Sequence, residues 1–202
     1  MLAQIVLFDG FDPLDVIAPY EVLTAGGVTA GLVSAEGARE VPSGLPPLGL
    51  RATGPLEPAR ADLVVVPGAA APVEAVADVL RRALGTGLPA LLGQCLDRPG
   101  VTTATVCGGS LVLALAGLIP GRPATTHRLG RDLLADAGAT PVRARVVDDG
   151  DLVTSGGVTS GLDLGLYLLE REFGARAALA VEDLFEHERR GTVWRSGDRH
   201  AA

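Results

Sequence analysis

A cysteine followed by two glycines is the most chemically informative feature of the sequence. Cys107 ends a stretch rich in β-branched residues, 101–106, and is followed by Gly108, Gly109 and an apolar helical pattern from Ser110. A side chain on so tight a strand-to-helix turn stands at the carboxyl end of a parallel sheet, where open α/β folds place their sites. Unpaired N–H groups at the start of the helix favour a thiolate. We therefore predict a nucleophilic Cys107, against the alternative of an inert core cysteine.

Two carboxylates on a predicted helix over 13–23 could exchange a proton with that thiol. Asp15 lies between Leu14 and Val16 near the start of this helix. A half-buried carboxyl there can hold a raised pKa and act as an acid or base. Taken alone, Asp15 fits a second interpretation equally well, that of a first-turn charge that complements the helix dipole. Glu21 lies on a different part of the helix circumference.

Other reactive residue types give weaker patterns. His127 follows Ala-Thr-Thr, a context more typical of a packed, hydrogen-bonded histidine than of a thiol's partner. Residues 155–160 lack the G-x-S-x-G order of a nucleophilic serine, so we expect a turn with Ser160 capping the next helix. Cys95 is taken as incidental. The three histidines, His127, His187 and His200, are dispersed, and no metal site or cofactor is predicted.

Composition limits the possible classes of protein. The 202 residues are 48% hydrophobic, enough for one well-buried core. A net charge of −7 without a basic patch disfavours nucleic acid as a partner. All 17 basic residues are arginine, which removes lysine Schiff-base and P-loop chemistry. With two cysteines, no evident signal peptide and no apolar run of membrane-spanning length, we expect a cytoplasmic protein that does not enter a membrane.

Alternation of strand and helix patterns predicts the fold class. It is α/β: a doubly wound, mostly parallel sheet with helices on both faces and a small edge hairpin within 36–61. One domain is expected over 1–185, followed by a polar, poorly ordered tail over 186–202; residues 85–100, with Cys95, are expected to be loop or a frayed helix end. Strands are predicted at 4–8, 30–35, 62–66, 101–106, 143–147 and 152–154, and helices at 13–23, 73–84, 110–118, 128–137 and, as the last long one, 160–173.

Several motifs follow one another in a recognisable order. They are Leu14-Asp15 with Pro19 and Glu21-Val22-Leu23, Val66-Pro67-Gly68, Val106 to Ser110, Ala116-Gly117-Leu118 with Ala124 to His127, and Gly156 to Asp163. In this order, from about residue 4 to 185, the chain resembles the ThiJ/PfpI superfamily, which has the class I glutamine amidotransferase-like fold. More narrowly, the chain resembles the isonitrile hydratase branch and the related amino-terminal domains of AraC-type regulators.

The resemblance implies a flavodoxin-like fold, a homodimer, no cofactor and a small-molecule substrate. It places the nucleophile on Cys107 and the acid/base on Asp15. The implied reaction is hydration of an isonitrile to an N-substituted formamide through a thioimidate on the cysteine. Substrate or oxyanion contacts are expected from Gly68, Ala69, Gly108 and Gly157, with Glu21 and His127 as supporting residues.

The chain departs from the hydratase pattern near the expected site. Gly108 replaces a usual threonine, Ala69 replaces the second glycine of Pro-Gly-Gly, Arg128 replaces a common tryptophan, and 85–100 is longer than usual. Two alternatives therefore stay open: a ligand-sensing or scaffold protein without catalysis, and another thiol-dependent reaction, glyoxalase-like or biosynthetic.

Overall fold

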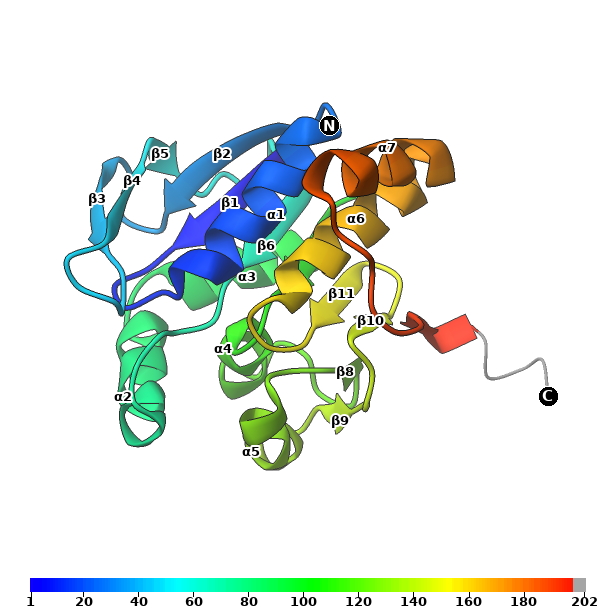
Figure 1. The fold of residues 1–202 in the computed structure, drawn as a ribbon. Coiled ribbons are helices and arrows are strands. Elements are labelled where there is room, and N and C mark those ends of the chain that lie inside the picture. Colours follow the sequence, from blue (N-terminus) through cyan, green and yellow to red (C-terminus); the bar gives the residue numbers. More distant parts are fainter. Residues whose placement is uncertain (198–202) are drawn as a thin grey trace.

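A computed structural model describes residues 1–197, and residues 198–202, including His200, lie outside the described part. Eight strands form one sheet in the order β12-β10-β11-β7-β6-β1-β2-β5 (Figure 1), in which all neighbours are parallel except the antiparallel pair β10 and β11. The strands are β1 (Leu2–Leu7), β2 (Thr29–Ser34), β5 (Gly54–Pro55), β6 (Leu63–Val66), β7 (Thr102–Thr105), β10 (Val146–Asp148), β11 (Leu152–Ser155) and β12 (Trp194–Arg195).

Helices cover both faces of this sheet (Figure 1). Helix α6 (Ser160–Phe173) packs against α1 (Pro13–Ala25) and α7 (Ala175–Phe185) on one face. On the other side, α4 (Gly109–Leu115) packs against α2 (Val73–Leu84), α3 (Leu88–Leu96) and α5 (Arg131–Asp136), which follows a 3-10 turn, η1 (Arg128–Gly130). The central strand β6 is buried along its whole length, as expected of a parallel strand covered on both sides. The predicted doubly wound α/β fold is confirmed.

Two small two-stranded sheets lie outside the main one. Strands β3 (Arg39–Pro42) and β4 (Gly49–Ala52) form an antiparallel hairpin within the predicted 36–61 region. Strands β8 (Pro123–Ala124) and β9 (Thr140–Pro141) pair in parallel. None of the helices in residues 1–197 has the length and apolar character needed to cross a bilayer.

The prediction of a loop over 85–100 is wrong, because helix α3 occupies most of it. Gly and Pro residues are typical of breaks in a helix, but Pro89 stands in the first turn of α3, where its missing N–H costs no helical hydrogen bond. Cys95 is fully buried on α3 and belongs to the hydrophobic core. Helix α7 was also missed: Gly174, with a φ of +86°, ends α6, and a new helix starts at once.

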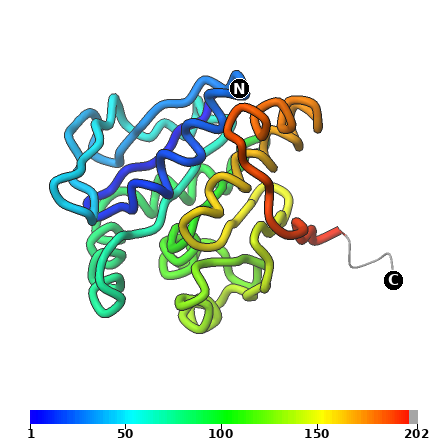
Figure 2. Tube along the Cα trace, in the orientation of Figure 1, coloured from blue at the N-terminus to red at the C-terminus, as the bar shows by residue number. Residues whose placement is uncertain are grey.

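The C-terminal segment is ordered further than the predicted tail would be. After α7 the chain runs back to the sheet (red in Figure 2), where β12 pairs with β10. The Arg190 N–H donates to Asp163 Oδ1 at 2.8 Å, and Arg189 forms ion pairs with Glu170 and Glu182. Side chains of α6 and α7 bind Arg189 and the Arg190 N–H, and the local sequence does not reveal these contacts. The domain boundary at residue 185 stays a prediction.

Candidate active site

Cys107 occupies a strained turn between β7 and α4. Its φ is +55°, a left-handed conformation that costs a non-glycine residue about 1 kcal/mol. The Cys107 N–H donates to the carbonyl oxygens of Ser155 (3.1 Å) and Gly156 (3.0 Å), and its own carbonyl accepts from Thr126 Oγ1 at 2.8 Å. These bonds from the next strand and loop hold the strained backbone in place. The predicted sharp strand-to-helix turn is therefore present.

The two glycines after the cysteine differ in how closely they approach neighbouring backbone. A Cβ atom on Gly109 would lie 2.1 Å from the carbonyl oxygen of Val66, so only glycine fits there without a shift of the chain. A Cβ atom on Gly108 would lie 3.5 Å from Gly68 Cα, which is ordinary van der Waals contact. The turn thus requires glycine at the second position and leaves room at the first.

Asp15 lies behind the cysteine, fully buried on the first turn of α1. Its Oδ2 accepts the Gly68 N–H at 2.9 Å, and its Oδ1 is buried without a hydrogen-bond partner among the described residues. A Cβ atom on Gly68 would lie 2.9 Å from Asp15 Oδ2, 3.1 Å from Cys107 Cβ and 2.5 Å from Gly108 N. The carboxyl, the thiol-bearing carbon and the start of α4 therefore converge on Gly68, and a larger residue there would separate them.

This environment raises the pKa of both groups. Burial raises the pKa of Asp15 to about 8; the Asp12 charge adds to the rise, and the Gly68 N–H and the nearby Cys107 thiol oppose it. Burial and then the Asp15 charge raise the pKa of Cys107 to about 12, while the N–H groups of Gly108 and Val158 act to lower it. The expectation of a thiolate favoured by the helix N-terminus is wrong for the free site: two backbone N–H groups do face the sulfur, but burial beside a carboxylate outweighs them.

A cavity of about 470 Å³ lies beside Cys107, which forms part of its wall. Cys107 itself is 8% exposed. Cys107 is therefore a buried residue that borders the cavity. Asp12 and His127 are the residues with polar side chains other than Cys107 in this wall, which is otherwise formed by apolar side chains and glycines. The site can present one thiol and one buried carboxyl to a molecule held in the cavity.

Of the other predicted site residues, some line the cavity and others do not. Ala69 and Gly108 line the cavity, whereas the Gly68 N–H is already bound to Asp15, so it does not face a ligand. Gly157 lies against His127, because a Cβ atom there would be 2.1 Å from His127 Cδ2. Glu21 is exposed on α1 and is not part of the cavity wall.

His127 lines the cavity but is engaged locally, since its Nδ1 accepts the Leu129 N–H at 3.3 Å. Ser160 does not cap α6 as predicted. Thr159 is the residue before the helix, and Ser160 is already helical with its hydroxyl donating to Gly157 O at 3.0 Å.

Two contributors to the site were missed in the sequence. The Val158 N–H is a backbone group with no side-chain signature, so the sequence gives no sign of it. Asp12 caps α1 through a 2.9 Å bond to the Leu14 N–H and faces the cavity. An aspartate directly before Pro13 is a readable N-cap signal, and it could have been placed beside Asp15.

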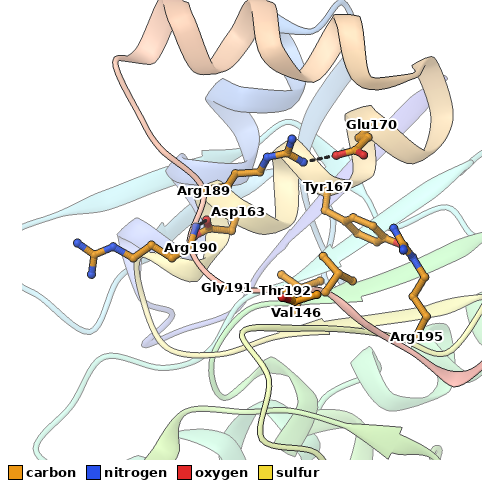
Figure 3. A pocket seen from close by; sticks show the side chains of 10 residues that line it. Val146, Asp163, Tyr167, Glu170, Arg189, Arg190, Gly191, Thr192 and Arg195 are labelled. Atoms are coloured by element: carbon orange, nitrogen blue, oxygen red, sulfur yellow. Dashed lines mark hydrogen bonds and ion pairs between the residues drawn. The ribbon is translucent and has the colours of Figure 1, made fainter. Parts of the chain in front are cut away.

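A second cavity, of about 330 Å³, lies under the C-terminal segment (Figure 3). Asp163, buried on α6, accepts from Arg145 Nε at 2.6 Å and from the Arg190 N–H. The Arg195 guanidinium lies 5.4 Å from the centre of the Tyr167 ring. These contacts tie the segment to α6. Within the described chain, no group of three or more His, Cys, Asp or Glu side chains is arranged to hold a metal ion.

The comparison with family models settles the family. The model of the DJ-1/PfpI family matches residues 1–171, most of the chain and all of the elements around Cys107. The chain belongs to the DJ-1/PfpI family. Among solved structures, this family member is similar to a ThiJ/PfpI family protein from Pseudomonas syringae, with a TM-score of 0.80 and 27% identity over 94% of this chain and 76% of that one. Drosophila melanogaster DJ-1beta shares the fold with a TM-score of 0.78 and 22% identity, over 93% and 98% of the two chains.

Curated relatives of this DJ-1/PfpI protein differ in what they are. Isonitrile hydratase of Pseudomonas putida is 48% identical over 83 residues, which are 41% of this chain and 36% of that protein. The HTH-type transcriptional regulator CdhR of Pseudomonas aeruginosa is 33% identical over 141 residues, 68% of this chain and 39% of the regulator. The aligned parts make up less than half the length of these relatives.

Proposed function

We propose that the protein is a cysteine-dependent hydratase that converts an isonitrile into an N-substituted formamide. The observation that carries this proposal is the pairing of Cys107, at the edge of a cavity, with the buried Asp15 carboxyl behind it. The partial match to an isonitrile hydratase supports the same chemistry. A nucleophile and a group able to hold its proton are the two functions that such a reaction needs.

In the first step, the Cys107 sulfur bonds to the terminal carbon of the isonitrile. The neutral Asp15 carboxyl gives its own proton to that carbon and takes up the thiol proton as the bond forms, which leaves Asp15 neutral and gives a thioimidate, Cys107–S–CH=N–R. A carboxyl whose pKa is about 8 suits this exchange, because it gains and loses a proton with little cost near neutral pH.

In the second step, water adds to the carbon of the thioimidate. The C–S bond then breaks, the nitrogen and the sulfur each end with one proton, and R–NH–CHO and free Cys107 are released. The Ala69 backbone N–H, at the cavity wall, is the proposed partner for the oxygen of the tetrahedral adduct. Summed over both steps, one isonitrile and one water give one formamide.

Turnover of alkyl and aryl isonitriles, followed by mass spectrometry of the formamide, tests the proposal. Cys107→Ala is expected to abolish turnover, and Asp15→Asn to lower it by at least about 100-fold. Cys95→Ala is the matched control, since it removes the other thiol from the core and is expected to keep turnover. Absence of formamide from every isonitrile, or turnover that survives in Cys107→Ala, would reject the hydratase.

A second candidate is a ligand-sensing protein that does not consume its ligand. The alignment with CdhR covers more of this chain than the alignment with the hydratase, and Gly108 lacks the hydroxyl that the resemblance to hydratases leads one to expect. A ligand that raises the melting temperature progressively as its concentration increases, and is recovered unchanged, would favour this candidate. The homodimer and the cytoplasmic location stay predictions.

A further inference from the structure

The cavity beside Cys107 is much larger than an isonitrile group. At about 30 Å³ for a water-sized group, its 470 Å³ holds on the order of fifteen non-hydrogen atoms. The reacting –N≡C unit fills two such positions. Most of the space is therefore available for the rest of the substrate.

The walls around that space are hydrocarbon. Helix α2 contributes Val73, Val76 and Leu80 to the wall. Helix α4, which contacts both α2 and α5, contributes Leu111. Leu129 of η1 and Leu133 of α5 also line the cavity. In Figure 1, α2 and α5 stand on either side of α4. Val73 and Leu129 are 68% and 58% exposed, so large apolar side chains continue out to the mouth. An apolar body along this path would be removed from water on binding.

The charged side chain in the cavity wall is a carboxylate. Asp12 raises the pKa of both Asp15 and Cys107, which shows that its field reaches the reacting groups. No arginine is among the described residues that line the cavity, and His127, the basic side chain there, uses its Nδ1 lone pair to accept the Leu129 N–H. A negative substrate group would therefore meet Asp12 without a counter-charge.

We propose that this site selects uncharged substrates with a bulky apolar group and excludes anionic ones. The inference rests on the proposed use of Cys107 as the nucleophile. Each methylene buried against the α2 and α5 walls improves binding by up to about fourfold. An isonitrile with a hexyl or benzyl group is thus preferred over a methyl one, and an isonitrile that carries a carboxylate is disfavoured.

Alkylation of Cys107 tests the selectivity without requiring any hydratase activity. Rates with iodoacetamide, N-hexyl iodoacetamide and iodoacetate are measured by mass spectrometry of the Cys107 peptide and divided by the rates for the same protein unfolded in urea. We expect the hexyl reagent to react at least about tenfold faster than iodoacetamide, with saturation, and iodoacetate to react more slowly than iodoacetamide.

Two variants and one control variant assign these effects to the cavity. Val76→Trp fills it from α2 and should remove the preference for the hexyl reagent, whereas Leu184→Trp, on the exposed face of α7, should keep it. Asp12→Asn keeps a good helix cap and should raise the iodoacetate-to-iodoacetamide rate ratio severalfold. A ratio is used because this substitution also changes the reactivity of the thiol towards both reagents.

The proposal is overturned if the normalised rates show no size preference, if iodoacetate reacts as fast as iodoacetamide, or if Val76→Trp and Leu184→Trp behave alike. The hydratase proposal fails by a different result, the absence of formamide from every isonitrile. A protein that alkylates selectively but makes no formamide would keep the cavity's selectivity and lose the proposed reaction.

Discussion

Asp15 and Cys107 compete for one negative charge in a buried space. Burial penalises the ionised form of each, and ionisation of either makes ionisation of the other harder. The resting site near neutral pH is therefore a neutral carboxyl beside a neutral thiol. Such a pair stores a proton next to the nucleophile, and the protein pays for this arrangement with stability.

That cost gives a prediction on pH and stability. The pKa of Asp15 is about 8 in the folded protein and 3.8 ordinarily, so between these values the folded state binds more protons than the unfolded state. The free energy of unfolding therefore falls as the pH rises from about 4 to 8. From about pH 5.5 to 8.5 the fall due to Asp15 is on the order of 3 kcal/mol.

Asp15→Asn should remove this dependence, since an amide does not ionise and still accepts the Gly68 N–H. Urea unfolding of both proteins at the two pH values measures the difference. We expect the variant to gain stability over the wild type mainly at the higher pH. Equal pH dependence in the two proteins would show that Asp15 does not carry the raised pKa.

At the scale of elements, the site depends on how closely β6, β7 and α4 approach one another. The strand-to-helix turn was predictable because β-branched residues, a cysteine and two glycines are all local signals. The contacts of Asp15 were not predictable from the sequence, since Gly68, its hydrogen-bond partner, lies 53 residues away in the chain. Nor does a local pattern reveal that burial would raise the pKa of Cys107 and not lower it.

The two glycines after Cys107 provide a matched pair of substitutions. Gly109→Ala places a Cβ atom 2.1 Å from the Val66 carbonyl oxygen and should cost about 3 kcal/mol, because strand backbone has to move. Gly108→Ala places one at ordinary contact distance and should cost less than about 1 kcal/mol. Urea denaturation of both variants measures this difference, and equal losses would contradict the close approach of α4 to β6.

At the scale of the whole molecule, the C-terminal segment closes one edge of the sheet. The alternation of strands and helices predicted the doubly wound core, since parallel strands buried on both faces read as continuous apolar runs. Helix α7 and strand β12 escaped prediction, because α7 packs on α6, and the segment before β12 is held by Asp163, Glu170 and Glu182 through contacts that no local pattern reveals.

Removal of the segment should reach the loop beside the active site. A chain ending at His187 loses β12 and the Arg190 N–H that Asp163 accepts, while Asp163 also holds Arg145, which donates to Thr159 at 3.0 Å. We expect the melting temperature to fall by about 5 °C or more and amide exchange in 156–159 to become faster. The full-length protein is the reference; unchanged exchange in the shorter chain would contradict the coupling.

The covalent state of Cys107 during turnover is the most direct test of the account. The protein is mixed with an alkyl isonitrile, quenched in acid within the first turnovers, digested and weighed by mass spectrometry. We predict that the Cys107 peptide gains the mass of one isonitrile, as a thioimidate requires, and that this adduct disappears as formamide is released. Formamide that accumulates with no adduct on Cys107, and at the same rate in Cys107→Ala, would contradict the central claim.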